Sequence, residues 1–127
     1  MPTLVFRVNT AGAGGAATGE TQLAFPLDTG FVSGVRLAFH ASAPATTTVV
    51  IAEVEGLQQT ILAPAAGNVG GLYYPSTPVH TTQGVAVDGQ SSVIQVEGPI
   101  KVTVAGCNAL QDAVIVTLRL LRNREVN

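Results

Sequence analysis

Every second residue is apolar along most of this chain, and this alternation limits its fold more than any other feature. In residues 114–121, VIVTLRLL, large aliphatic side chains recur at every other position around Thr117 and Arg119. A period of two places successive side chains on opposite faces of a β-strand, with one face in a core. No segment combines a helical period with helix formers and caps. Similar alternating runs occupy residues 4–8, 35–40, 47–54, 94–96 and 100–104.

Turn-forming combinations of Gly, Pro, Asn and Asp separate these runs. Many short strands between frequent turns are typical of an all-β sandwich. The length of 127 residues fits one domain. We therefore predict a single-domain antiparallel β-sandwich over residues 1–127, and both jelly-roll and immunoglobulin-like topologies stay open. The turn signals fall at residues 28–30, 43–44, 55–56, 88–89, 97–99 and 106–108.

Two segments interrupt the alternation. Residues 10–19, TAGAGGAATG, consist of small residues that bury too little apolar area to order themselves, so we predict a flexible Gly/Ala loop or an arm that orders on a neighbour. Residues 70–82 hold both tyrosines, two prolines and His80. Because proline cannot donate to a central ladder, we predict a Pro-rich loop or a sheet edge there.

Charged residues make up only 11% of the chain, whereas hydrophobic residues make up 46%. An ordinary soluble domain carries about a quarter of its residues as charges and uses them to stay in solution. The surface must therefore consist of Thr, Ser, Gln and Asn, or be covered by neighbouring subunits. Both interpretations favour part of an assembly over an enzyme.

Charge and hydropathy also exclude several classes of partner. The formal net charge is −2, and the six Lys and Arg residues are spread along the chain, so we expect no nucleic-acid partner. No stretch approaches the roughly 20 apolar residues of a membrane helix, so we expect no membrane span. The first residues, MPTLVFRVNT, show no signal-peptide pattern, and we expect synthesis in a cytoplasm.

Residues typical of metal and catalytic sites are present without the spacing that such sites need. His40 and His80 lie far apart in the chain, with no ligand nearby in sequence. Glu53 and Glu55 share one face of a strand, and we interpret them as its polar end rather than as a calcium or hydrolase pair. Cys107 has no base or cation beside it in sequence and cannot form an internal disulfide. We expect no metal and no cofactor.

The sequence also lacks the motifs of nucleophilic catalysis and phosphate binding. No serine sits in a G-x-S-x-G elbow. The glycine-rich residues 12–19 precede a strand pattern rather than a helix, so the phosphate-cradling geometry is missing. We predict that the protein has no catalytic residues and is not an enzyme.

Several strands are apolar on both faces, and a sandwich has only one core layer to cover them. We expect subunit contacts to bury the apolar faces that point away from the core, because large exposed apolar patches mark interaction sites. Tyrosine is favoured in such contacts. The interface residues that we predict are Leu4 and Phe6 in the first strand, Tyr73 and Tyr74 in the Pro-rich segment, and Arg122 and Arg124 near the C-terminus.

Residues 35–51, VRLAFHASAPATTTVVI, form a strand, an Ala-Pro turn and a second β-branched strand. Together with residues 94–104 and 114–121, this pattern resembles the small β-sandwich head proteins of tailed bacteriophages. The resemblance implies a virion structural protein: a decoration, or cement, protein that binds the major capsid protein on the outer surface of the head and stabilises it. Such proteins are made in the host cytoplasm and carry no catalytic residues.

A symmetric homo-oligomer, such as a trimer, would bury the second apolar faces. The alternative from a different functional class is a carbohydrate- or receptor-binding β-sandwich module of a phage fibre or spike. With aromatic residues at 5% and no tryptophan, the sequence offers few platforms for a sugar ring.

Overall fold

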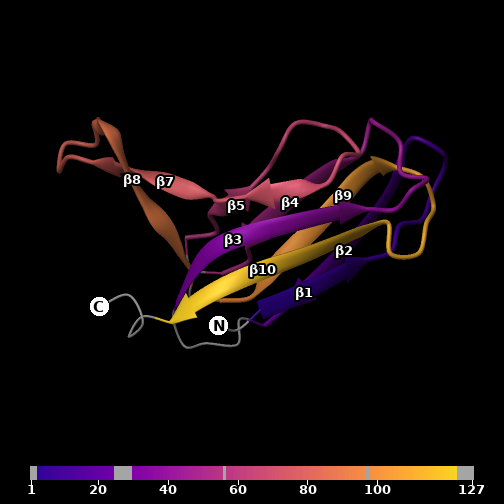
Figure 1. The fold of residues 1–127 in the computed structure, drawn as a ribbon, viewed down its shortest axis with the longest axis horizontal. Helices are drawn as coiled ribbons and strands as arrows, with labels where there is room; N and C mark the ends of the chain where they lie inside the picture. Colours follow the sequence, from indigo (N-terminus) through magenta and orange to yellow (C-terminus); the bar gives the residue numbers. More distant parts are fainter. Residues whose placement is uncertain (1–2, 25–29, 56, 97, 123–127) are drawn as a thin grey trace.

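The computed structural model describes residues 3–24, 30–55, 57–96 and 98–122, and it folds them into two packed antiparallel sheets (Figure 1). No helix occurs among these residues, and accordingly none of them forms a helix long and apolar enough to cross a membrane. The prediction of an all-β sandwich is confirmed. The strands are β1 Thr3–Val8, β2 Ala17–Leu23, β3 Gly30–Phe39, β4 Thr48–Glu53, β5 Thr60–Leu62, β6 Gly71–Tyr73, β7 Ser76–His80, β8 Ala86–Val96, β9 Ile100–Cys107 and β10 Val114–Arg122.

The strand order selects the jelly-roll topology of the two that the sequence left open. One sheet has the order β1-β10-β3-β8-β7, with β6 also paired to β3, and the other has the order β2-β9-β4-β5. Four antiparallel pairs, β1 with β10, β2 with β9, β3 with β8 and β4 with β5, follow from one long hairpin. Curling that hairpin so that β10 meets β3 and β9 meets β4 produces a jelly roll.

The core lies between the two sheets and follows the predicted alternation. In β10 the residues Val114, Val116, Leu118 and Leu120 are fully buried, while Arg119 between them is exposed. The same inward alternation holds along β9. Burial of aliphatic side chains is the main stabilising term of such a sandwich. The largest fully buried side chains include Phe6, Leu37, Ile51, Ile100, Leu118 and Leu120.

Strands β6 and β7 are additions to the eight-stranded roll, inserted in the connection from β5 to β8. The Pro-rich segment predicted as a loop or a sheet edge at residues 70–82 therefore contains two short strands. They lie at edges, as its prolines require: β6 pairs with β3 alone, and β7 pairs with β8 alone.

The small-residue segment at residues 10–19 turns back on itself at one end of the sandwich. Ala11 and Thr18 form an isolated bridge, and β2 begins within the segment, at Ala17. The side-chain oxygen of Asn108 accepts a hydrogen bond from the backbone N–H of Gly15 at 3.0 Å. The segment thus has partners within the chain, whereas its flexibility stays a prediction.

Candidate functional site

An open groove of about 380 Å³ lies on the outer face of the six-stranded sheet. Most of its side chains alternate with those that enter the core and face away from the second sheet, whereas Val35 and Tyr73 belong to the side that packs on the core. Strands β1, β3 and β10 of the roll contribute to it, and the added β6 and the residue after it close one side. The lining residues are Thr3, Gly34, Val35, Arg36, Leu72, Tyr73, Tyr74, Thr117 and Arg119.

Strand register assembles the middle of this groove from three strands. Arg36 on β3 pairs with Thr117 on β10 and, on its other side, with Leu72 on β6. Residues that are directly opposite on neighbouring strands have Cβ atoms about 5 Å apart. A hydroxyl, a guanidinium and an apolar side chain therefore form one row across the sheet.

Arg119 lies beside this row, at the point where a β-bulge interrupts the ladder. Arg119 pairs with Gly34, but the next residue of β10, Leu120, pairs with Val32, so Ser33 has no partner on β10. The Ser33 hydroxyl donates a hydrogen bond to the Arg119 carbonyl oxygen and accepts one from Arg119 Nε, both at 3.1 Å. Bulges re-aim side chains next to binding sites. Here the bulge fixes the base of the Arg119 guanidinium and leaves its two terminal nitrogens available.

Gly34 lets two side chains of the groove approach its floor. A Cβ atom built on Gly34 would lie 3.7 Å from both the Nη2 atom of Arg119 and a ring carbon of Tyr74. The guanidinium and the aromatic ring therefore converge on the same small volume. The side chain of Tyr74 is 67% exposed and that of Leu72 is 57% exposed, so an aromatic and an aliphatic surface are both accessible in the groove.

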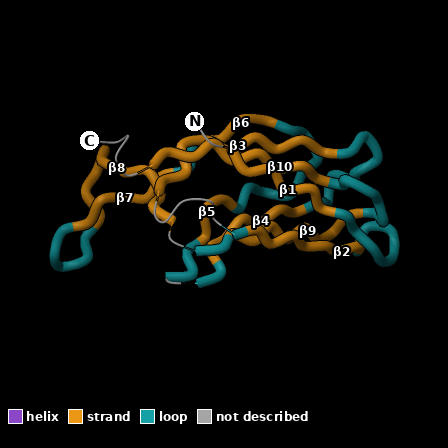
Figure 2. The backbone as a smooth tube through the Cα atoms, turned by 90° about the horizontal axis from the view of Figure 1, so that it is seen from below, coloured by secondary structure: helices purple, strands orange, loops and turns teal. Residues whose placement is uncertain are grey.

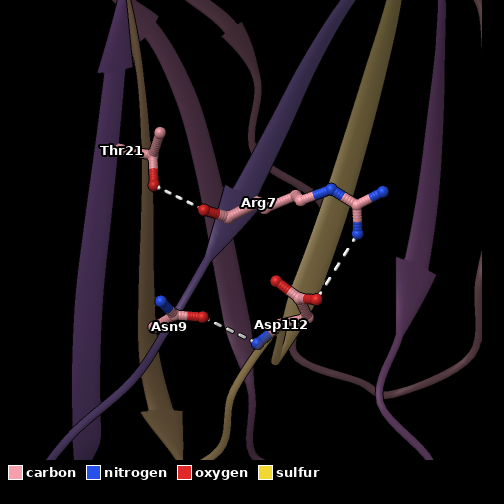
Figure 3. Close-up of polar contacts among 4 residues, drawn as sticks. All are labelled: Arg7, Asn9, Thr21 and Asp112. Carbon is pink, nitrogen blue, oxygen red and sulfur yellow. Dashed lines mark hydrogen bonds and ion pairs between the residues drawn. The ribbon is translucent and has the colours of Figure 1, made fainter.

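The groove concentrates positive charge in a chain whose net charge is negative. Arg36 and Arg119 line it, no acidic residue lines it, and neither arginine forms an ion pair with a described residue. A third arginine on the same sheet face, Arg7, differs because its Nη1 atom lies 3.4 Å from a carboxylate oxygen of Asp112 (Figure 3). Two guanidinium groups thus remain for an external anion.

A second depression continues the groove along β3 and β6. It has a volume of about 450 Å³ and shares Arg36 and Leu72 with the first. Gly70 and Gly71 form part of its wall. The two depressions together form an extended surface channel rather than an enclosed cavity.

The second candidate surface is the hairpin of β7 and β8, which extends beyond the end of both sheets (Figures 1 and 2). Only the last part of β8 belongs to the sandwich, where residues from Ile94 to Val96 pair with β3. Residues 80–86 and 88–93 are exposed, including Val85 at 60% and Val93 at 37%. We call residues 76–93 the arm.

A third surface is the outer face of the four-stranded sheet. Cross-strand pairs there join Val50 to Thr103 and Thr48 to Ala105, so small and hydroxylated side chains occupy its middle. Val50 is 39% exposed. The charges described on this face, those of Lys101 and Glu20, lie 3.7 Å apart. The low proportion of charged residues in the sequence is therefore visible on the outer face of this sheet.

The predicted interface residues lie in different environments. Phe6 is fully buried in the core and Leu4 is half-buried against it, because both point inward from β1; Phe6 therefore cannot serve as a surface contact. Tyr73 also packs partly against the core, whereas Tyr74 lies exposed in the groove. Arg122 is the last residue of β10. The prediction for Arg124 falls outside the described residues.

Residues considered for metal binding or catalysis do not gather into a site. Among the described residues, no group of three or more His, Cys, Asp or Glu side chains could hold a metal ion. Glu53 is buried at 5% exposure rather than lying on an exposed strand end, while Glu55 is exposed beyond β4. Cys107 is a fully buried free thiol.

Comparisons with known proteins leave the chain without a family. No protein-family model matches it, and no curated protein sequence matches it. A solved structure described as "CBM4 structure and function" aligns with 93% of this chain and 92% of its own, at 11% identity and a TM-score of 0.28. A likeness this distant carries no argument about function.

Sequence reasoning missed Ser33, Gly34 and Arg36 as site residues. The alternation places Arg36 on an outward face, but its neighbours Thr117 and Leu72 lie far away in the sequence. Only the pairing of β3 with β10 and β6 brings these residues together. A serine and a glycine inside a mostly apolar strand, SG at residues 33–34, are the one local signal of the bulge.

Proposed function

We propose that the protein is a non-catalytic structural subunit of a virion: a decoration protein that forms homo-oligomers and binds the major capsid protein on the outer surface of a phage head. The observation that carries this proposal is the arm. Its residues extend from the sandwich with most side chains in solvent (Figure 1), and among the described strands its edge strand β7 pairs only with β8.

An isolated two-stranded hairpin is at best marginally stable in water, because it has no apolar layer to bury. The arm exposes Val85 and Val93, and Asp88 is its only acidic residue. Low charge with hydroxylated and β-branched side chains suits a surface that becomes covered, since charged residues are depleted in the cores of interfaces. We infer that the arm is ordered by a neighbouring subunit.

The outer face of the four-stranded sheet, whose described charges are the paired Lys101 and Glu20, offers a second area of contact for neighbouring subunits. Two contact areas on one small subunit are what a protein needs in order to bridge the subunits of a shell. Jelly rolls recur in viral capsid proteins and also in lectins and cupins, so the fold agrees with the proposal without deciding it. The phage head as the partner rests on the resemblance of the strand pattern.

Reconstitution on heads that lack the protein tests this proposal. Wild-type protein and a variant with residues 77–92 replaced by Gly-Gly are mixed with such heads, and bound protein is measured after sedimentation. We expect the wild-type protein to bind saturably and to raise the temperature at which heads release DNA. The shortened variant should bind much more weakly. Gln111→Ala, at an exposed position outside the arm and the four-stranded sheet, serves as a surface control and should bind normally. Equal binding of the shortened variant, or no binding of the wild type, contradicts the proposal.

The groove favours a second candidate function, a saccharide-binding module. Shallow clefts that combine an accessible aromatic side chain with a few polar groups are typical ligand sites, and Tyr74 with Arg36 and Arg119 meets that description. A glycan array probed with the fluorescently labelled protein tests this function. Saturable binding that Tyr74→Ala abolishes supports it, and an array without saturable binding contradicts it.

A further inference from the structure

We infer that the groove above Gly34 binds an acidic saccharide, with its carboxylate held by Arg36 and Arg119 and a sugar ring against Tyr74. This inference rests on the second candidate function, saccharide binding, and adds the chemical class of the ligand. It does not depend on whether the protein decorates a head. The argument starts from the positions of the two arginines.

Arg36 and Arg119 are diagonal neighbours across β3 and β10. Arg36 is directly opposite Thr117, and Arg119 lies two residues further along the same face of β10. Diagonal neighbours in an antiparallel pair are about 7 Å apart, within reach of long side chains. Like charges this close repel each other, and no acidic residue lines the groove to offset the repulsion. A bound anion removes that repulsion.

The chemistry of arginine favours a carboxylate as that anion. The planar guanidinium presents its N–H groups as a fork that matches the two oxygens of a carboxylate. Arg119 Nε donates a hydrogen bond of 3.1 Å to the Ser33 hydroxyl. The terminal nitrogens of this guanidinium, which lines the groove, have no protein partner among the described residues. The Thr117 hydroxyl beside Arg36 adds a neutral donor or acceptor.

The neighbouring side chains favour a sugar over a small inorganic ion. The face of an aromatic ring carries partial negative charge and attracts the positively polarised C–H edges of a pyranose. Tyr74 offers such a face in the groove, because its side chain is 67% exposed. Leu72 adds an apolar surface between the two depressions, which together give room for more than one sugar unit.

Titration calorimetry with two matched oligosaccharides tests the inference. The probes are trigalacturonate and its fully methyl-esterified form, which keeps the sugar rings and removes the charge. We expect the acid to bind at least about tenfold more tightly than the ester, because charge-assisted hydrogen bonds to a carboxylate are stronger than neutral ones. Added salt should weaken binding of the acid.

Arginine variants locate the binding site. Arg36→Gln and Arg119→Gln should each weaken trigalacturonate binding by roughly ten- to a hundredfold. The matched control is Arg7→Gln, on the same sheet face but outside the groove and already paired with Asp112, and it should leave the affinity unchanged. Circular dichroism and the urea midpoint of each variant establish that it is folded.

Three results would overturn the inference, and they are distinguishable. Equal affinity for the acid and the ester would support saccharide binding but would show that the carboxylate does not contribute to the affinity. Absence of binding for both probes contradicts the acidic-saccharide ligand, whereas a neutral glycan hit on the array would still support the second candidate function. Equal binding of a hexaglutamate peptide, lost in Arg36→Gln and Arg119→Gln, would assign the groove to an acidic protein segment instead.

Discussion

The hydroxyl of Ser33 both donates to the carbonyl oxygen of Arg119 and accepts from its Nε atom, at 3.1 Å in each case. This reciprocal pair closes the bulge in β3 at the point where the ladder to β10 shifts by one residue. It connects a local irregularity of the backbone to the orientation of a charged side chain. The geometry of the groove therefore depends on Ser33, although Ser33 is not one of its lining residues.

Replacing Ser33 with Ala should lower the free energy of unfolding by about 0.5–1 kcal/mol, because two partly exposed hydrogen bonds are lost. Urea unfolding measures the change. In a double-mutant cycle with Arg119→Gln the two losses should not add, since both substitutions remove the hydrogen bond from Arg119 Nε. Ser92→Ala is the matched control, because that hydroxyl bonds only to the carbonyl oxygen of the next residue. Fully additive losses would show that Ser33 does not orient Arg119.

Two glycines with positive φ should respond differently to Ala. Gly106 has a φ of 63°, and a Cβ there would collide with the carbonyl oxygen of Thr46. Gly84 has a φ of 83°, but a Cβ there would meet nothing within 4 Å. We expect Gly106→Ala to cost about 2–5 kcal/mol from backbone strain plus the collision, and Gly84→Ala about 1–2 kcal/mol from strain alone. Thermal and urea unfolding measure both, and equal losses would contradict the collision at Gly106.

The sequence predicts which strand faces enter the core, because that depends only on local alternation. Every second residue from Val114 to Leu120 is fully buried, as the period of two requires. It also predicts an edge or a loop at Pro75 and Pro78; Pro78 lies in the edge strand β7 and Pro75 in the connection before it. Neither result needs knowledge of which strands are neighbours.

The groove could not be predicted in the same way, because its composition depends on strand order and register. Arg36 meets Thr117 only because β3 pairs with β10, and the same register places Arg119 opposite Gly34, directly before the bulge at Ser33. The prediction of Phe6 as a contact residue is wrong for a different reason. It rests on the position of Phe6 in the first strand, whereas the alternation alone places this side chain in the core. The sequence places Tyr73 and Tyr74 in a Pro-rich segment, which is a local signal, but which of the two is exposed follows only from the structure, and a contact role for Tyr74 stays a prediction.

Asp112 combines an unusual backbone conformation with two polar contacts. Its φ is 50°, its N–H donates to the side-chain oxygen of Asn9 at 2.8 Å, and its carboxylate lies 3.4 Å from Arg7 Nη1 (Figure 3). The Thr21 hydroxyl donates to the Arg7 carbonyl oxygen at 2.9 Å, which links β2 of the other sheet to the same cluster.

Asp112→Ala should lower the free energy of unfolding by about 1–2 kcal/mol, because Ala tolerates the left-handed region poorly. Asp112→Asn should change it by less than about 0.5 kcal/mol. Asn tolerates this conformation, and an ion pair between half-exposed groups contributes little. Urea unfolding at low salt measures both variants. A loss for Asp112→Asn as large as that for Asp112→Ala would show that the ion pair, rather than the backbone, stabilises this turn.

The arm should contribute almost nothing to the stability of the isolated subunit. Its residues lie outside the core, and only the end of β8 from Ile94 to Val96 is anchored in the sandwich. Replacing residues 77–92 with Gly-Gly should therefore leave the urea midpoint of the free protein unchanged. Backbone amides of the arm should also exchange with solvent far faster than those of β10, because local opening of the hairpin costs little. The control Ile94→Ala removes a buried side chain at the root of the arm and should cost about 2–5 kcal/mol. A large loss of stability on shortening the arm, or slow exchange in a dilute monomer, would mean that the hairpin is stabilised within its own subunit and needs no neighbour.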